Sequence, residues 1–339
     1  MKIIRSAVFL LFFCGLTACL PEDDFNPSPQ ANFDALWKIM DEHYCFFEYK
    51  KIDWNDVYAK YQPRITSQMS DEALFKELGD MLAELKDGHV NLVSNFSMSR
   101  YWDWYLDYPD NFDSKIQRNY LERDYYITSG IDYKILDDNI GYMYYGNFSN
   151  GIGDSNLDQI IKKFYGCPGI IIDIRNNSGG LLTNVDVLAS RFTGEKILTG
   201  YSKYKTGKGH RDFSKPEAKY LNPSDRLRYQ KTVVVLTNRQ CFSAANEFVN
   251  VMRLLPTVTV MGDRTGGGSG FPMSSELPNG WSVRYSACPG YTPDMKDIEF
   301  GIDPDIKVDM TESDMRKGID TMIETARQYI TAQKNNSKN

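Results

Sequence analysis

The sequence predicts an α/β protein in which a mostly parallel sheet is joined by crossover helices and preceded by a small helical N-terminal subdomain. Residues 169–174 (GIIIDI) and 233–237 (VVVLT) are continuous apolar runs of strand length, typical of strands that are buried on both faces. Each run is followed by a short loop and then by apolar residues at helical spacing. This alternation of strand, turn and helix indicates parallel strands with crossover connections.

The composition is that of a folded protein, and it excludes several classes of function. Of the 339 residues, 42% are hydrophobic, enough to form the core of one large domain or two smaller ones. The net charge is −6 and no block of lysine and arginine is present, so we expect no nucleic-acid partner. The sequence has neither a cluster of metal ligands nor a G-x-x-x-x-G-K-[ST] phosphate loop, and we therefore expect no metal and no other cofactor.

Residues 1–18 have the pattern of an export leader. Lys2 and Arg5 precede an apolar run, residues 7–16, that is too short to span a membrane as a mature helix. The run ends in LTAC (16–19), which resembles the cleavage box of bacterial lipoproteins and implies that Cys19 is lipidated. The alternative is an ordinary signal peptide with a chance cysteine.

The segment after this box, residues 19–31, is acidic and rich in proline, which predicts a flexible tether. The lipoprotein resemblance implies a cell-envelope protein held at the outer membrane by an N-terminal lipid, on the periplasmic or the surface face. We interpret the acidic residues 22–24 (EDD), directly behind the cysteine, as a sorting signal for surface display.

The N-terminal subdomain is expected over residues 32–94. Apolar residues recur at helical spacing, and the second helix is predicted to begin at Ser70 as N-cap and to stop at residues 86–88 (KDG), where the glycine breaks it. Residues 89–93 then alternate like a strand. Residues 95–138 are rich in aromatic residues without a clear period and form a connecting segment.

The α/β core is expected over residues 139–330, followed by a polar tail, 331–339. Residues 196–230 are polar and are predicted to run irregularly over the surface. The predicted elements of the core are a strand at 140–145, a helix at 157–165, a strand at 169–174, a glycine turn at 176–180, a helix at 184–192, a strand at 233–237, a helix at 243–255 and a strand at 258–261.

Ser243 is the candidate nucleophile. It stands at the start of a helix that follows a buried strand, where free backbone N–H groups can stabilise developing negative charge. Serine is also a favoured helix cap, so the position alone does not establish catalysis. Cys241 is a rival nucleophile, but it precedes the helix start and gains little from the helix dipole.

Two segments together resemble the tail-specific (C-terminal processing) serine peptidases. Residues 173–180 (DIRNNSGG) match the motif D-[LI]-R-x-N-x-G-G, and residues 243–247 (SAANE) match S-A-[SA]-x-E. Residues 262–268 (GDRTGGG) and 301–305 (GIDPD) resemble two later motifs of the same family, so the likeness runs over nearly the whole mature chain.

This resemblance implies a core like that of crotonase and Clp protease, and hydrolysis of peptides or unfolded proteins through an acyl-enzyme on Ser243. It also implies that the N–H groups of Gly179 or Gly180 and of Ala244 form the oxyanion hole.

The resemblance also implies the base. In the processing branch a lysine follows the third motif, but here Gly268 stands at that place. The sequence instead resembles the branch related to the tricorn protease core, which uses histidine. Residues 85–89 (LKDGH) resemble its L-x-D-x-H motif, which assigns the base to His89.

The two other histidines, His43 and His210, are expected at the surface or in packing. Glu299 is the nearest match to the glutamate that orients the histidine in this branch, and Asp297 is an open alternative.

The sequence departs from many members of the family in one respect. Only residues 90–139 separate His89 from the strand at 140, which is near the lower limit of ~50 residues for any domain, so a complete PDZ module is not expected. Residues 101–126 are expected either to cover the cleft or to pack against the neighbouring helices. A non-catalytic lipoprotein that binds peptides or small ligands on the same fold is the alternative function.

Overall fold

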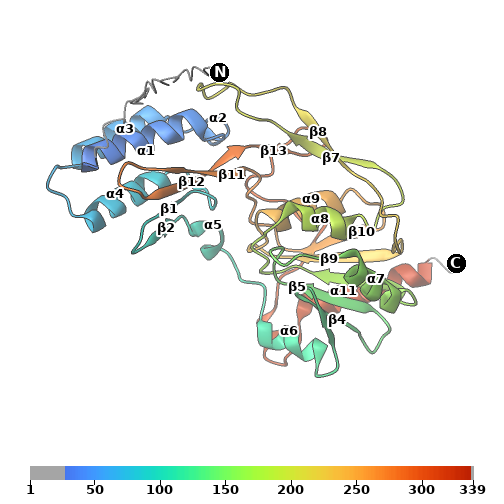
Figure 1. The fold of residues 1–339 in the computed structure, drawn as a ribbon. Coiled ribbons are helices and arrows are strands. Elements are labelled where there is room, and N and C mark those ends of the chain that lie inside the picture. Colours follow the sequence, from blue (N-terminus) through green and yellow to red (C-terminus); the bar gives the residue numbers. More distant parts are fainter. Residues whose placement is uncertain (1–26, 337–339) are drawn as a thin grey trace, which may run out of the picture.

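The computed structural model describes residues 27–336. The predicted leader, Cys19 and most of the predicted tether therefore lie outside the described residues. Within residues 27–336, no helix is long and apolar enough to cross a bilayer. Figure 1 shows two layers: the N-terminal helices with a small sheet, and a larger α/β unit that contains the C-terminal helix.

The N-terminal layer begins with four short helices. Their bounds are α1 (Pro29–His43), α2 (Phe47–Lys50), α3 (Trp54–Tyr61) with a 3₁₀ turn at Gln62–Arg64, and α4 (Asp71–Ala83). The predicted cap of α4 is confirmed, since Ser70 Oγ accepts a hydrogen bond from the N–H of Ala73 at 3.3 Å. The predicted helix stop at residues 86–88 comes too late, since α4 ends at Ala83, and Lys86 instead of Gly88 adopts the positive φ, 48°, that turns the chain.

A four-stranded antiparallel sheet packs against these helices. Its order is β11-β12-β1-β2, with bounds β11 (Phe271–Glu276), β12 (Ser282–Cys288), β1 (Asn91–Val93) and β2 (Met98–Arg100). Strands β11 and β12 come from the second half of the chain, so the sheet joins segments that the sequence assigned to different domains. Helices and sheet share one apolar core, which includes Phe33, Leu36, Leu78, Leu82, Leu92 and Val283.

The larger unit is built on a seven-stranded sheet of order β14-β10-β9-β6-β5-β4-β3. The five strands from β14 to β5 are parallel, and β4 and β3 add an antiparallel edge, which confirms the predicted mostly parallel sheet. The bounds are β3 (Tyr126–Thr128), β4 (Ile131–Ile135), β5 (Gly141–Tyr145), β6 (Gly169–Asp173), β9 (Thr232–Thr237), β10 (Val258–Gly262) and β14 (Ile306–Lys307).

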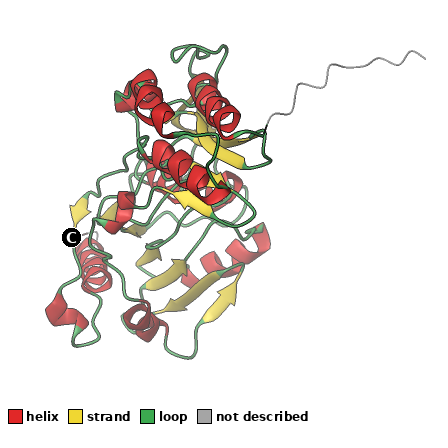
Figure 2. Ribbon diagram, turned by 90° about the vertical axis from the view of Figure 1, so that its left-hand side faces the viewer, coloured by secondary structure: helices red, strands yellow, loops and turns green. Residues whose placement is uncertain are grey.

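Helices cover both faces of this sheet, which explains the continuous apolar runs. Ile170 and Ile172 of β6 pack in one core with the helices α7 (Asp154–Phe164), α8 (Leu182–Ala189) and α9 (Ala244–Met252). Ile171, which points the other way, packs in a second core with α6 (Ser114–Leu121) and α11 (Thr321–Asn336). The view in Figure 2 shows the N-terminal layer at one end of the molecule and this sheet at the other.

The sequence suggested that residues 196–230 are irregular, and this prediction is wrong. They contain β7 (Ile197–Ser202) and β8 (Glu217–Leu221), which pair antiparallel with each other. A third strand, β13 (Gly290–Tyr291), completes this small sheet. Both strands are only partly buried, and β8 (EAKYL) also carries charged residues, so their apolar pattern is weak. Two further short helices are α5 (Asp103–Leu106) and α10 (Glu312–Met315).

The topology brings the two motif turns together. Strands β6 and β9 are parallel neighbours, with Asp173 paired to Leu236 near their carboxyl ends. The glycine turn follows β6 and Ser243 follows β9, so both lie at the same edge of the sheet. The N–H of Phe242 donates to the carbonyl of Asn177 at 3.0 Å, which ties one turn to the other.

Candidate active site

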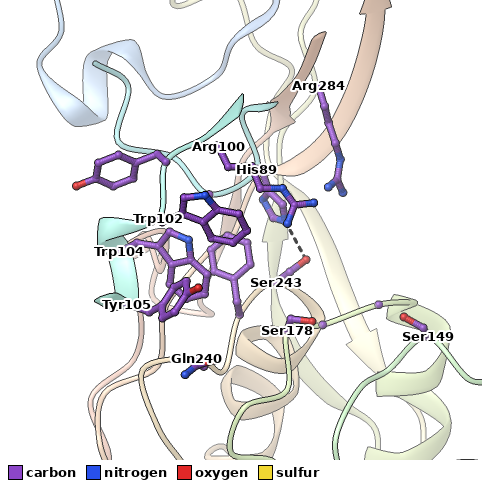
Figure 3. Close-up of a pocket in the computed structure, with 15 residues that line it drawn as sticks. His89, Arg100, Trp102, Trp104, Tyr105, Ser149, Ser178, Gln240, Ser243 and Arg284 are labelled. Carbon is purple, nitrogen blue, oxygen red and sulfur yellow. Dashed lines mark hydrogen bonds between the residues drawn. The ribbon is translucent and has the colours of Figure 1, made fainter. Parts of the chain in front are cut away.

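Ser243 lies at the sharp turn between β9 and α9. Its backbone has φ 58° and ψ −120°, a conformation that is uncommon for a residue with a side chain. The hydroxyl does not cap the helix, so the alternative that Ser243 is only a cap is wrong. Instead Ser243 Oγ is 2.9 Å from Nε2 of His89, as Figure 3 shows.

His89 reaches the site from the N-terminal layer, between α4 and β1. Asp87 Oδ1 accepts a hydrogen bond from the His89 N–H at 2.8 Å, which shapes the turn. The imidazole lies against the ring of Phe242, with 4.7 Å between centroids, and Phe242 in turn stacks on Trp104 at 4.3 Å. The ring of His89 is thus held in place by packing from two other segments of the chain.

His89 is 3% exposed, and its burial controls its charge. Burial lowers the pKa of His89 to about 4, the Asp87 carboxylate opposes this, and Arg284 and Lys50 lower the pKa further. The imidazole is therefore neutral at pH 7 and able to accept a proton from Ser243. Its Nδ1 is buried and has no hydrogen-bond partner among residues 27–336.

The structure does not bring His43 or His210 to Ser243. His210 Nε2 is 2.7 Å from Asp41 Oδ1, and its ring stacks on Phe47. His43 stacks on Tyr285 in the N-terminal layer.

Glu299 lies near the site, but among the described residues it forms no hydrogen bond with His89. Its Oε1 is 3.0 Å from Nζ of Lys50, and its Oε2 accepts the N–H of Ser269 at 2.9 Å. Burial, and next the charge of Asp87, raise the pKa of Glu299 to about 8, against the influence of Lys50. Glu299 is thus placed to act on His89 only through other residues.

Lys50 and Asp87 supply this link. Lys50 Nζ is 3.5 Å from Asp87 Oδ2, and both side chains are almost fully buried. Burial by itself would raise the pKa of Asp87, but the charge of Lys50, together with the hydrogen bonds from the His89 N–H and from Tyr44, favours the carboxylate and the pKa is lowered, so Asp87 is ionised. Asp87 Oδ2 also accepts hydrogen bonds from Tyr44 at 2.9 Å and Ser286 at 3.0 Å.

Sequence reasoning missed Lys50 and gave Asp87 no role. The LKDGH motif contained Asp87 and could have identified it. Nothing local to Lys50 signals its partners, because they are distant in the sequence.

Asp297, the alternative third group, forms no hydrogen bond with His89 or Ser243 among the described residues. Its Oδ1 accepts the N–H of Glu299 at 2.7 Å, and it lines a separate cavity with Cys45 and Tyr49 that contains neither His89 nor Ser243. Burial raises the pKa of Asp297 to about 6. Its place indicates that it shapes the loop of Glu299.

The glycine turn presents one of the expected oxyanion donors. The N–H of Gly179 is already donated to Asn177 Oδ1 at 2.9 Å. Within the described residues, the N–H groups of Gly180 and Ala244 have no hydrogen-bond partner. Of the candidate donors, Gly180 and Ala244 are therefore the two that are available to a developing oxyanion.

Close packing explains why glycine is present in this turn. A Cβ atom on Gly179 would lie 2.7 Å from the carbonyl oxygen of Phe242 and 2.8 Å from Cβ of Ser243. The φ of 99° at Gly179 also disfavours any side chain. The turn can approach Ser243 only because no side chain intervenes.

Gly268, which stands where the processing branch has lysine, has no room for that side chain. A Cβ atom there would lie 2.5 Å from Cζ of Phe242, and φ is 79°. The space is already occupied by the ring that packs against His89.

Cys241 is not placed as a nucleophile. Its side chain is fully buried, and Sγ donates a weak hydrogen bond to the carbonyl of Ile174 at 3.0 Å. Burial raises the pKa of Cys241 to about 12, so the thiol stays protonated. The cysteine alternative is therefore wrong.

Ser243 lies between two cavities. The first has a volume of about 360 Å³ and contains His89, two arginines and the aromatic residues of the connecting segment, including Trp102 and Trp104. The second has a volume of about 540 Å³ and does not include His89. Part of its wall is apolar and is formed by Leu181, Leu182, Phe271 and Pro272.

Comparison with family models supports the resemblance seen in the sequence. Residues 139–308 match the model of peptidase family S41, and residues 25–83 match the model of the tricorn protease C1 domain. A solved structure of a candidate peptidase from Parabacteroides merdae is 58% identical, with a TM-score of 0.87. The match covers 90% of this chain and 97% of that one.

More distant relatives share part of the sequence or the fold. A "Probable CtpA-like serine protease" of Staphylococcus haemolyticus is 29% identical over 201 residues, which are 57% of this chain and 39% of the relative. The corresponding protein of Staphylococcus epidermidis is 27% identical over 190 residues, 56% of this chain and 37% of the relative. The chain thus spans less than two fifths of the length of these curated relatives.

The photosystem II D1 C-terminal processing protease has a similar fold, with a TM-score of 0.55 at 15% identity over 84% of this chain and 94% of that one. The long family match and the 58% identical structure show that the chain belongs to peptidase family S41.

Proposed function

We propose that this protein is a serine-type endopeptidase that hydrolyses exported or envelope proteins and peptides through an acyl-enzyme on Ser243. The observation that carries the proposal is the 2.9 Å contact between Ser243 Oγ and the neutral imidazole of His89, beside two unpaired backbone N–H groups. A nucleophile, a base and oxyanion donors are the parts that acyl transfer requires.

The proposed reaction has two steps. His89 accepts the proton of Ser243 while Oγ forms a bond to the substrate carbonyl carbon, and Gly180 and Ala244 donate hydrogen bonds to the oxyanion. Protonated His89 then donates the proton to the leaving amine as the C–N bond breaks, and water hydrolyses the acyl-enzyme by the reverse sequence. The ionised Asp87 stabilises protonated His89 by its charge, and Glu299, acting through Lys50 and Asp87, is a positioning residue.

An active-site serine probe tests the proposal directly. A fluorophosphonate should label the full-length chain but neither Ser243→Ala nor His89→Ala, and a peptide-library digest should show cleavage that depends on Ser243. Arg316→Gln, an exposed change on α10, serves as the control. Equal cleavage by wild type and Ser243→Ala would falsify the proposal. Peptide binding without labelling would favour the non-catalytic alternative.

We also propose that Cys19 is lipidated and holds the enzyme at the outer membrane, on the periplasmic or the surface face. The LTAC sequence and the acidic, proline-rich segment behind it support this proposal. In the native host, labelled fatty acid should be incorporated into wild type and not into Cys19→Ser. Protease shaving of intact cells would distinguish the two faces. The absence of label from wild type would refute the anchor.

A further inference from the structure

Two arginines lie beside the proposed catalytic pair, on one face of the four-stranded sheet of the N-terminal layer. Arg100 of β2 and Arg284 of β12 are both register partners of Asn91 in the central strand β1. Residues directly opposite each other on neighbouring strands point to the same face of a sheet. Both arginines line the first cavity, and Figure 3 shows them next to His89 and above Ser243.

Neither guanidinium has a direct partner among the described residues. In the described structure, no hydrogen bond or ion pair joins the side chain of Arg100 or Arg284 to another residue. The guanidinium of Arg100 is 5.1 Å from the centre of the Trp102 ring. Burial, and next the like charge of Arg100, lower the pKa of Arg284 against the weaker opposing charge of Asp87, so the two cations are close enough to repel each other.

The cavity around these arginines contains no acidic side chain. Although the chain has 45 aspartate and glutamate residues and a net charge of −6, none of them lines the first cavity. Two uncompensated cations in a partly enclosed site are stabilised by an anion from outside. Guanidinium groups bind carboxylates through two parallel hydrogen bonds, which makes a carboxylate a well-matched anion.

The position of His89 indicates which half of the substrate carries this carboxylate. The histidine must donate its proton to the leaving amine, so the leaving half has to lie on its side of Ser243. The first cavity contains His89 and both arginines, whereas the second contains Ser243 and shares Arg284 but has neither His89 nor Arg100. The acyl half therefore fits the second cavity and the leaving half fits the first.

We propose that Arg100 and Arg284 form a subsite that binds a carboxylate on the leaving half of the peptide substrate. The carboxylate is either the free C-terminus of the chain or an acidic side chain. This inference rests on the proposed peptidase function. It assigns selectivity for the substrate to the four-stranded sheet of the N-terminal layer.

Matched peptides test the subsite and separate the two sources of the carboxylate. The peptides share one acyl half, and their leaving halves end in a free carboxylate, in an amide, or in an amide with an internal glutamate or lysine. Wild type should cleave at least one carboxylate peptide with a kcat/KM about tenfold or more above that of the neutral amide. If the peptide with the free C-terminus is cleaved faster, the carboxylate is the C-terminus. If the amide with the internal glutamate is cleaved faster, the carboxylate is an acidic side chain.

The variants Arg100→Gln, Arg284→Gln and the double variant should lose this preference while they still cleave the neutral amide peptide. Arg316→Gln is the matched control and should keep the preference. Equal rates for all peptides with wild type, or an equal loss for all peptides in the arginine variants, would overturn the subsite.

A binding measurement makes the test independent of catalysis. Full-length Ser243→Ala should bind a fluorescent leaving-half peptide bearing the carboxylate with a Kd about tenfold or more below that of its neutral amide, and the added Arg100→Gln and Arg284→Gln changes should remove the difference. Equal Kd values overturn the subsite even if no peptide is cleaved. The absence of both labelling and cleavage in wild type refutes the peptidase function instead, so the two failures are distinguishable.

Discussion

At the scale of single residues, the site depends on a strained serine and a buried histidine. The positive φ of Ser243 directs its hydroxyl away from helix α9 and toward His89. Burial keeps the imidazole neutral, because its charged form would lose solvation. Each residue is thus held in the state that proton transfer requires before a substrate arrives.

The acid limit of activity should reflect the lowered pKa of His89. Because the pKa is lowered to about 4, the neutral base persists as the pH falls, and kcat/KM for a neutral peptide should decline only as the pH approaches about 4. Arg284→Gln removes a nearby cation, which raises the pKa of His89 and moves this limit to higher pH. The measurement is kcat/KM against pH, with circular dichroism to show that the protein stays folded.

Arg316→Gln should leave that pH profile unchanged. An acid limit at or above pH 6.5 in wild type would contradict the assignment of the limit to buried His89.

Gly179→Ala should impair catalysis much more than another glycine substitution. The new Cβ would lie 2.7 Å from the Phe242 carbonyl oxygen at a φ of 99°, so the turn must move and carry the N–H of Gly180 with it. The loss of one oxyanion donor typically lowers kcat by about 10²–10³. Gly151→Ala is the control, since no atom lies within 4 Å of its added Cβ. Equal kcat values for the two variants would disprove the role of the turn.

At the scale of secondary-structure elements, the DIRNNSGG motif joins β6 to α11 as well as to the active site. Arg175 is fully buried and forms ion pairs with Asp173 at 2.6 Å and Asp320 at 2.9 Å. Asp320 Oδ1 accepts hydrogen bonds from Met322 and Ile323 at the start of α11. The first half of the motif thus anchors helix α11, while its glycines allow the turn to pack closely against Ser243.

Arg175→Leu should destabilise the fold strongly. It leaves Asp173 and Asp320 buried without a cation, and breaking a buried ion pair in this way costs about 3–5 kcal/mol. Urea unfolding measures the change. Arg316→Leu breaks an exposed pair with Glu312 and should cost no more than about 1 kcal/mol. If both variants unfold alike, Arg175 is not the anchor of α11.

At the scale of the whole molecule, the two layers must dock for the proposed catalytic pair to form. His89 belongs to the N-terminal layer and Ser243 to the core. Lys50 links the layers, since it contacts Asp87 beside His89 and Glu299 on the core side. Its Nζ also donates to the carbonyls of Leu85 and Lys86.

The link continues from Glu299 back to the nucleophile. The carbonyl of Glu299 accepts the N–H of Gly268 at 2.9 Å, and the neighbouring Gly267 carbonyl accepts the N–H of Ser243 at 2.8 Å. A series of short contacts therefore connects the base to the nucleophile around the interface, in addition to their direct hydrogen bond.

Lys50→Met should disturb both stability and catalysis. Asp87 and Glu299 would be left buried without their cation, at a cost of about 3–5 kcal/mol, and kcat should fall because His89 is held less well. Adding Glu299→Gln should recover part of the stability, since the amide, unlike the buried carboxyl group, needs neither a cation nor an added proton. Lys60→Met, which breaks an exposed pair with Glu84, is the control. A double variant no more stable than Lys50→Met would contradict a direct coupling of Lys50 to Glu299.

Local patterns made much of the fold predictable. The apolar runs at β6 and β9 identify buried strands because a strand covered on both faces has no polar side. By contrast, β7 and β8 were missed because they are partly exposed, and their pairing with β13 joins segments far apart in the sequence. The sequence also did not predict that β11 and β12 join the N-terminal layer, because β12 pairs with β1, a strand far away in the sequence.

The sequence by itself determined the buried parallel strands, the turns at their carboxyl ends and, through its motifs, the family. These features follow from periodicity and from residue types within short segments. The tertiary structure decided that His89 meets Ser243, that Cys241 is buried, and that Glu299 pairs with Lys50 instead of His89. It also brought together Arg100 and Arg284. These outcomes depend on contacts between distant segments, which form only when the two layers pack, and no local pattern encodes them.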